Sequence, residues 1–203
     1  SVMYRSALRK ARTVFFENEE NAQFFLHKNI ISAQQMKVLP GAGINLDEYP
    51  YVPMRDDGVC SFLFVGRIMK EKGVDEFFTA AKTVKAEFGE KVAFDVVGFY
   101  EDAYKETVDH LVADRVINFH GFQTDVHPFY EAADCVVLPS YHEGMSNVLL
   151  EGAATGRALI TSDIPGCREA VEDGVSGYIC PAKDADTLYD TMQCLSLIHI
   201  SEP

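Results

Sequence analysis

The sequence predicts an α/β protein built on a doubly wound parallel sheet. From about Phe62 onward, short apolar runs typical of buried strands alternate with segments whose apolar residues recur at helical spacing. We expect strands at residues 61–65, 93–97, 116–119, 135–138, 158–161 and 177–180. Strands that alternate with helices form right-handed crossover units and a parallel sheet covered on both faces. Ligands of such sheets bind at the carboxyl ends of the strands, so a functional site is expected there.

The segments between these strands carry the helical patterns. Between the first two strands, apolar residues recur every three or four positions, at Val74, Phe77, Phe78, Ala81, Val84 and Phe88. We expect further helices at residues 103–113, 126–133, 147–155 and 185–194. Gly156 directly follows the helix expected at 147–155 and predicts its end, because glycine adopts the left-handed backbone that terminates helices.

The first sixty residues have a different organisation. Residues 14–18 and 36–39 predict strands, and residues 20–27 predict a helix. We interpret residues 1–45 as the remnant of a preceding domain, residues 46–59, with Pro50 and Pro53, as a linker, and residues 60–194 as the α/β domain. An isolated strand and helix cannot make a core of their own, so we expect this remnant to pack on the α/β domain or to fray.

Residues 195–203 do not continue the amphipathic pattern of the helix expected before them. We interpret this tail as a vector- or adapter-derived run and leave it out of the fold prediction.

Composition and charge restrict the partners. The chain has 203 residues and a net charge of −13, and this acidity argues against nucleic acid, whose phosphates need clustered Lys and Arg. No apolar stretch approaches the roughly 20 residues of a membrane span, and the first residues do not resemble a signal peptide. The five cysteines are an odd number at wide spacings, which favours reduced thiols in a cytoplasmic protein over disulfides or a zinc site.

Two loops carry residues suited to phosphate and sugar chemistry. The strand at 61–65 leads into Gly66 and Arg67, and Lys72 stands just before the next helix, so two cations flank one loop. Arg67 and Lys72 could clamp a diphosphate, one as a planar fork and one as a point charge, or they could simply form a solvated basic turn. The Walker A phosphate loop and the dinucleotide fingerprint G-x-G-x-x-G are both absent from the sequence.

The second loop follows the strand at 135–138 and holds Glu143, with Glu151 eight positions later on the helix. Carboxylates accept hydrogen bonds from sugar hydroxyls, and the helix N-terminus between the two acids attracts phosphate. The alternative is an ordinary loop acid followed by an exposed helical acid. Ser146 is a candidate N-cap, which is also its purely structural interpretation. Cys167 is more readily explained by packing than by reactivity, and no residues have metal-ligand spacing.

These motifs occur in an order that resembles a known family. The segments Gly66-Arg67, Lys72-Gly73, Glu143 to Glu151, Asp163-Ile164-Pro165-Gly166 and Gly174 to Gly177 are similar to those of retaining, family 4-type glycosyltransferases of the GT-B fold. The variant Glu-Gly-Met-Ser-Asn-Val-Leu-Leu-Glu is similar to enzymes of capsule, exopolysaccharide and lipid-linked oligosaccharide assembly. The resemblance covers about residues 14–194 and implies the C-terminal, donor-binding half of such an enzyme, Rossmann-like, with a remnant of the N-terminal acceptor domain.

The resemblance also implies roles for individual residues. Arg67 and Lys72 would bind the donor diphosphate, Glu143 would contact the donor sugar, and Glu151 would hold the ribose. These three groups, Arg67, Lys72 and Glu143, would be catalytic in that they stabilise charge. The backbone of the glycine turn and of the helix start would complete the donor site, at Gly66, Gly144, Met145, Ser146, Asn147 and Val148. The loop near Gly121 and Phe122 would lie by the base.

The resemblance predicts transfer of a hexose or N-acetylhexosamine from a UDP-sugar to a saccharide or polyprenyl-linked acceptor, without a metal or other cofactor. It implies a cytoplasmic protein, with any contact at the inner face of the membrane made through the missing acceptor domain. We expect the chain alone to bind donor weakly and to transfer no sugar. The alternatives are a non-catalytic nucleotide-sugar-binding module and a GT-B epimerase. A phosphorylase is disfavoured because no lysine stands in a context suited to pyridoxal phosphate.

Overall fold

A six-stranded parallel sheet forms the centre of the protein, which is described by a computed structural model over residues 2–39 and 41–201. The strands are β3 (Cys60–Val65), β4 (Val92–Val97), β5 (Asn118–Gly121), β6 (Cys135–Leu138), β7 (Ala158–Ser162) and β8 (Gly177–Cys180). Their order is β5-β4-β3-β6-β7-β8 and every neighbouring pair is parallel. The chain builds outward from β3 to β5 and then returns to β6 on the other side of β3. This reversal confirms the doubly wound sheet and places a topological switch point between β3 and β6.

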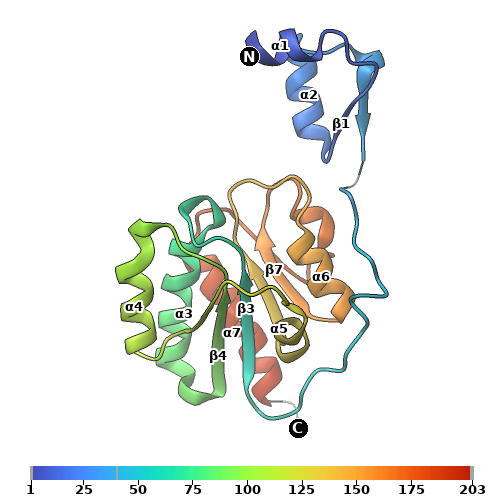
Figure 1. Ribbon diagram of the computed structural model, residues 1–203. Helices are drawn as coiled ribbons and strands as arrows, with labels where there is room; N and C mark the ends of the chain where they lie inside the picture. The colour runs from blue at the N-terminus through green and yellow to red at the C-terminus, as the bar shows by residue number, and fades with distance from the viewer. Residues whose placement is uncertain (1, 40, 202–203) are drawn as a thin grey trace.

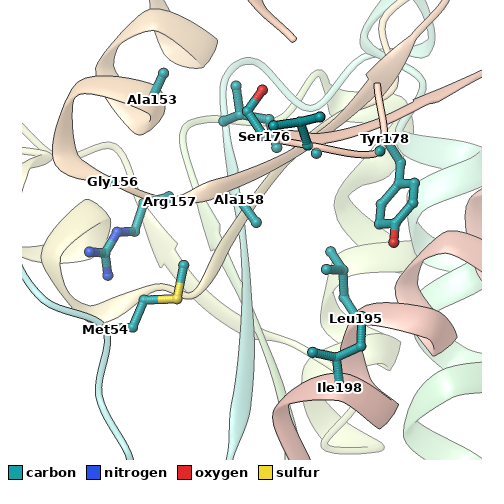
Figure 2. Close-up of a pocket in the computed structure, with 13 residues that line it drawn as sticks. Met54, Ala153, Gly156, Arg157, Ala158, Ser176, Tyr178, Leu195 and Ile198 are labelled. Carbon is teal, nitrogen blue, oxygen red and sulfur yellow. The ribbon is translucent and has the colours of Figure 1, made fainter. Parts of the chain in front are cut away.

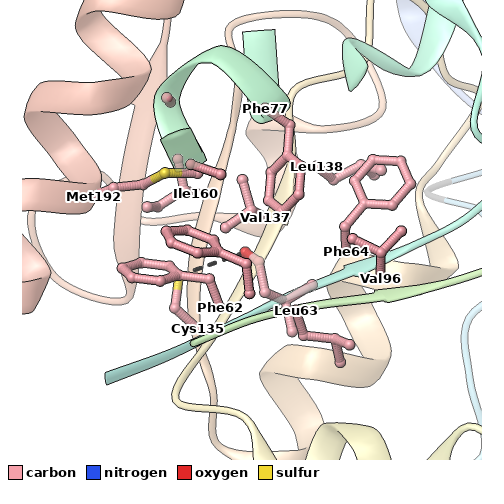
Figure 3. Packing of buried hydrophobic residues seen from close by; sticks show 14 of the residues in the cluster. Phe62, Leu63, Phe64, Phe77, Val96, Cys135, Val137, Leu138, Ile160 and Met192 are labelled. Carbon is pink, nitrogen blue, oxygen red and sulfur yellow. Dashed lines mark hydrogen bonds between the residues drawn. The ribbon is translucent and has the colours of Figure 1, made fainter. Parts of the chain in front are cut away.

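Helices cover both faces of this sheet (Figure 1). Helices α3 (Val74–Phe88), α4 (Lys105–Ala113) and α7 (Ala185–Ser201) lie on one face, and α5 (His127–Ala132) and α6 (Asn147–Thr155) lie on the other. The core between the layers is rich in aromatic residues, among them Phe62, Phe64 and Phe77 (Figure 3). The rings of Phe62 and Phe94 stack with centroids 5.1 Å apart. Each fully buried Phe or Leu side chain stabilises the fold by about 1.5–3 kcal/mol, so this core holds the strand ends in fixed register.

The first residues form a small unit with a core of its own. It contains α1 (Val2–Leu8), β1 (Val14–Phe16), α2 (Glu19–His27) and β2 (Met36–Val38), and β1 pairs with β2 in parallel. The buried residues of this core are Phe16, Ala22, Ile30 and Ile31. The expectation that this segment lacks a core was therefore wrong. Leu8 from α1 and the turn at Ile30 and Ile31 supply apolar side chains that the strand and helix patterns did not include.

The segment at residues 46–59 has no helix or strand, yet it is fastened to the α/β domain. The Val52 N–H donates to the Thr155 carbonyl at 3.1 Å, and the Tyr49 ring stacks on His127 at 4.4 Å. The buried Arg157 guanidinium donates to the carbonyls of Val52 and Ala133. Figure 1 shows this segment running down the side of α6 to the start of β3. The linker is thus held along its length by the domain it precedes.

Most expected elements agree with the structure to within two residues at each end, and two of the differences in their boundaries have a clear structural cause. The strand expected at 116–119 lies at Asn118–Gly121, because the N–H groups of Val116 and Ile117 both donate back to the Leu111 carbonyl at the end of α4. The last helix does not end at residue 194 but continues to Ser201. Ser196 is fully buried there and its hydroxyl donates to the Met192 carbonyl at 2.8 Å, so the first residues of the tail join the packed structure. Residues 202–203 of the tail lie outside the described residues. Within the described residues, no helix combines the length and apolar character needed to cross a bilayer.

Candidate functional site

The two loops that the sequence singles out meet at the carboxyl edge of the sheet, after β3 and β6. The Tyr141 N–H donates to the Glu71 carbonyl at 2.8 Å and joins the loops. Gly73 has φ of 67°, and a Cβ there would lie 1.9 Å from the Pro139 carbonyl oxygen. Only glycine fits so close an approach with a left-handed backbone. The start of α3 is therefore pressed directly against the loop that carries Glu143.

Lys72 and Glu143 form the central ion pair of this edge. The Lys72 Nζ donates to Glu143 Oε1 at 2.6 Å, and the two side chains are 24% and 14% exposed. The Ser140 hydroxyl donates to the same carboxylate oxygen at 2.7 Å. An ammonium has three donors and a carboxylate has about four acceptor positions, so this pairing leaves both groups with capacity for a ligand. The hydrogen bonds to Glu143 from Lys72 and Ser140 fix the position of its carboxylate without a ligand.

Arg67, the second cation of the sequence prediction, has a different setting. It lies just after β3 and is exposed. Among residues 2–39 and 41–201 it makes no hydrogen bond or ion pair. The backbone of this loop is nevertheless fixed, because the N–H of Gly66 donates to the Val97 carbonyl and that of Ile68 to the Phe99 carbonyl, each at 2.9 Å. The geometry thus places an exposed cation on a hydrogen-bonded loop that follows the same strand as Lys72.

Helix α6 begins in the middle of this site. Ser146 caps it, since its hydroxyl accepts from the Leu149 N–H at 3.4 Å, and its own N–H donates to the Gly166 carbonyl at 2.8 Å. The first N–H groups of a helix have no intrahelical acceptor, so those of Asn147 and Val148 are available to an anion. The predicted helix at 147–155 is confirmed with the same bounds. The site therefore combines a helix N-terminus with the Lys72–Glu143 pair.

Glu151 lies on the flank of α6 and already has a protein partner. The hydroxyl of the fully buried Tyr130 donates to Glu151 Oε2 at 2.8 Å. Burial and, after it, the Glu151 charge raise the pKa of Tyr49 to about 12, so this linker residue is also close to Glu151. The sequence did not indicate these contacts. The predicted ribose contact of Glu151 would use the carboxylate acceptor positions that the Tyr130 hydroxyl does not occupy.

Other candidate residues are placed in less reactive settings. Cys167 is fully buried, and burial is the main cause that raises its thiol pKa to about 12, which suits packing better than nucleophilic chemistry. In the part of the chain that the structure describes, no three His, Cys, Asp or Glu side chains are grouped to hold a metal ion.

Asn18 is a site residue that the sequence interpretation missed. It is only 6% exposed and joins the N-terminal unit to the Glu143 loop, because its Nδ2 donates to the Gly144 carbonyl at 3.1 Å. A local signal existed, since an asparagine before Glu19 and Glu20 is typical of a helix N-cap. The contact with the loop joins residues 126 positions apart, and no local pattern reveals it.

A separate cavity of about 460 Å³ lies at the opposite edge of the sheet (Figure 2). It is lined by the starts of β7 and β8, the end of α6 and residues Leu195 and Ile198 of α7. Its walls are mainly apolar, and neither Lys72 nor Glu143 is among the residues that line it. This cavity is therefore distinct from the candidate site.

The fold is a doubly wound α/β domain with a polar site at the carboxyl edge of its sheet. The comparisons identify its family. The family model described as "Glycosyl transferases group 1" matches residues 60–196, so the chain belongs to this family. The sequence is 26% identical over 205 residues to N,N'-diacetylbacillosaminyl-diphospho-undecaprenol alpha-1,3-N-acetylgalactosaminyltransferase of Campylobacter jejuni, an alignment that covers 95% of this chain and 53% of that protein. It is 34% identical over 149 residues to glycogen synthase of Mycobacterium tuberculosis, covering 70% of this chain and 35% of that enzyme.

Solved structures share the fold. TarM superposes with a TM-score of 0.82 at 16% identity, covering 98% of this chain and 39% of that one. HepE of Anabaena in complex with UDP superposes with a TM-score of 0.79 at 20% identity, covering 97% of this chain and 57% of that one. These likenesses confirm the Rossmann-like half of a GT-B fold. The chain spans about half the length of the first relative, so the activity of the whole protein is a matter for proposal.

Proposed function

We propose that this chain is the donor-binding part of a retaining glycosyltransferase. The enzyme would move a hexose or N-acetylhexosamine from a UDP-sugar to a saccharide or lipid-linked acceptor. The observation that carries this proposal is the Lys72–Glu143 pair, held at 2.6 Å beside the N-terminus of α6 at the switch point of the sheet. A cation and a helix N-terminus suit a diphosphate, and a fixed carboxylate suits sugar hydroxyls.

The proposed roles follow from these positions. Lys72 and the more exposed Arg67 would bind the diphosphate and offset the charge that develops on the departing nucleotide. Glu143 would accept hydrogen bonds from the donor sugar, and the backbone of residues 144–148 and of Gly66 would line the donor. Glu151 would hold the ribose hydroxyls beside Tyr130, and the loop near Phe122 would lie by the base. The side chains stabilise charge in this scheme, and none of them forms a covalent intermediate.

Names among the relatives support the choice of donor and acceptor. The HepE structures contain UDP and, in one case, UDP-glucose, and the Campylobacter relative is named for an undecaprenol-linked acceptor and an N-acetylgalactosaminyl group. We extend these chemistries to this chain as a proposal. The acceptor would be bound by the first half of a GT-B enzyme, and contact with the inner face of a membrane would be made there too. The nucleotide-sugar would act as substrate, with no resident metal or cofactor.

Calorimetric titration of the chain with UDP, GDP and ADP tests the proposal. We expect UDP to bind best, and Lys72→Met to weaken it by about tenfold or more, which corresponds to about 1.4 kcal/mol. Lys82→Met is the matched control, because Lys82 is an exposed lysine ten residues after Lys72, within α3. Preferential binding of GDP would overturn the choice of UDP. Equal losses in both variants would overturn the assignment of the site. We expect no sugar transfer by the chain alone, and measurable turnover would contradict that part.

A further inference from the structure

We propose that Asn18 is a positioning residue that sets the conformation of the Glu143–Gly144 peptide from the N-terminal unit. The inference rests on the proposed function, since it concerns the loop that would contact the donor sugar. Asn18 lies between β1 and α2, and Figure 1 shows this unit facing the carboxyl edge of the large sheet. It is polar yet only 6% exposed, so its amide has to satisfy its hydrogen bonds within the protein.

The Asn18 amide makes two kinds of bond at once. Its Oδ1 accepts from the Asn21 N–H at 2.9 Å and caps α2. Its Nδ2 donates to the carbonyl oxygens of Gly144 at 3.1 Å and Glu143 at 3.5 Å. The first bond fixes which end of the amide is oxygen, so the donating end must face the loop. The Asn18 side chain therefore caps the N-terminus of α2 in the first unit and also hydrogen-bonds to the Glu143 loop of the α/β domain.

Other hydrogen bonds fix the Glu143 loop at the Glu143 carboxylate and at the Ser146 N–H. Lys72 and Ser140 hold the Glu143 carboxylate, and the Gly166 carbonyl accepts from the Ser146 N–H. Asn18 is the group that orients the peptide between these anchors, because its Nδ2 holds the carbonyl oxygens of Glu143 and Gly144. The N–H groups on the other side of these peptides point away from their carbonyls. Fixing the carbonyls toward Asn18 therefore also fixes the direction in which the N–H groups of Gly144 and Met145 point.

The surrounding packing is close and leaves little freedom. A Cβ at Gly144 would lie 1.8 Å from Glu17 Oε2, and a Cβ at Gly41 would lie 2.5 Å from the Met145 side chain. Glu17 of the N-terminal unit and Gly41, shortly after that unit, thus lie close to Gly144 and Met145. A change at Asn18 should consequently be felt in the loop and in sugar recognition, and less in diphosphate binding, which uses Lys72 and Arg67.

The experiment compares Asn18→Ser with Gln35→Ala in the full chain. Serine caps a helix almost as well as asparagine but is too short to donate to Gly144. Gln35 fastens the N-terminal unit internally, since its Nε2 donates to the carbonyls of Leu8 and Ala11 at 3.1 and 2.7 Å, and it makes no bond to the site loop. Gln35→Ala therefore reports what loosening of the N-terminal unit does by itself. The readouts are hydrogen–deuterium exchange of the peptide covering residues 141–148 and calorimetric affinities for UDP and UDP-glucose.

We expect Asn18→Ser to accelerate exchange in residues 141–148 and to weaken UDP-glucose about threefold to tenfold more than UDP, the fold-change expected for one hydrogen bond. Gln35→Ala should leave both readouts close to wild type. Unchanged exchange in Asn18→Ser would overturn the proposal, as would the same change in both variants, which would make Asn18 a purely structural residue. If wild type binds neither ligand, the proposed function fails, and the exchange comparison still decides the role of Asn18.

Discussion

Replacing Lys72 by methionine tests the central pair most directly, because it removes the ammonium and keeps the straight apolar stem. Glu143 would then retain Ser140 as its donor but lose its countercharge. The carboxylate is 14% exposed, so the pair lies between a surface ion pair and a buried one. Surface pairs contribute about 0–1 kcal/mol, and breaking buried pairs costs about 3–5 kcal/mol. We therefore expect Lys72→Met to lower the free energy of unfolding by about 1–3 kcal/mol.

This loss corresponds to a fall in the melting temperature of roughly 3–9 °C for a chain of this size. Thermal denaturation followed by circular dichroism measures it. Adding Glu143→Gln should recover part of the loss, because the double variant leaves no unpaired carboxylate in a mostly buried position. UDP affinity should not recover, since the cation is still missing. A melting temperature equal to that of wild type together with full UDP affinity would refute the reasoning, and so would recovery of both properties in the double variant.

Three further predictions concern the same edge of the sheet. Glu151→Ala should weaken UDP binding by ~1–3 kcal/mol in calorimetry. Tyr130→Phe, which removes only the protein partner of Glu151, should leave UDP affinity nearly unchanged. A larger loss of UDP affinity in Tyr130→Phe than in Glu151→Ala would contradict the ribose assignment. Gly166→Ala should lower the melting temperature more than Gly174→Ala, because both have positive φ but only at Gly166 would a Cβ lie 2.0 Å from a backbone oxygen, and equal shifts would count against this packing. Burial raises the pKa of Cys167 to about 12 from 9.0, so its contribution to stability is complete below pH 9 and is lost as pH rises to 12. Cys167→Ala should make the alkaline fall in the free energy of unfolding shallower, and an identical pH profile would oppose this.

The strands of the sheet could be predicted well because each buried strand is a short apolar run within one local segment of the sequence. The runs at 135–138 and 177–180 are apolar and bounded by turn residues, and both strands have these bounds in the structure. The Lys72 and Glu143 loops could be placed at one edge because parallel strands end on the same side. The core of the first unit could not be predicted, because Leu8, Ile30 and Ile31 contribute to it and lie outside the strands and helix that the sequence pattern indicates.

The same distinction separates the parts of the site that could be predicted from those that could not. The N-cap role of Ser146 follows from its position before an apolar helix, and the structure confirms it. The contacts of Glu151 with Tyr130 and of Asn18 with Gly144 join distant segments. Such contacts depend on how helices and units pack, which spacing within one segment does not encode. Sequence alone therefore predicted that the Lys72 and Glu143 loops meet at one edge of the sheet, but it missed the residues that orient them.

The different contacts of Lys72 and Arg67 imply that the two cations have different roles in the proposed donor site. Lys72 is already ordered by Glu143, so a diphosphate that binds it immobilises little additional side chain. Arg67 is exposed and makes no bond among the described residues, so ordering it on a ligand costs up to about 2 kcal/mol of rotamer entropy. Lys72 shares its charge with Glu143, whereas Arg67 brings an uncompensated positive charge to a protein of net charge −13. Lys72 would accordingly fix where the diphosphate lies, and Arg67 would supply most of the net attraction that brings the diphosphate to the edge.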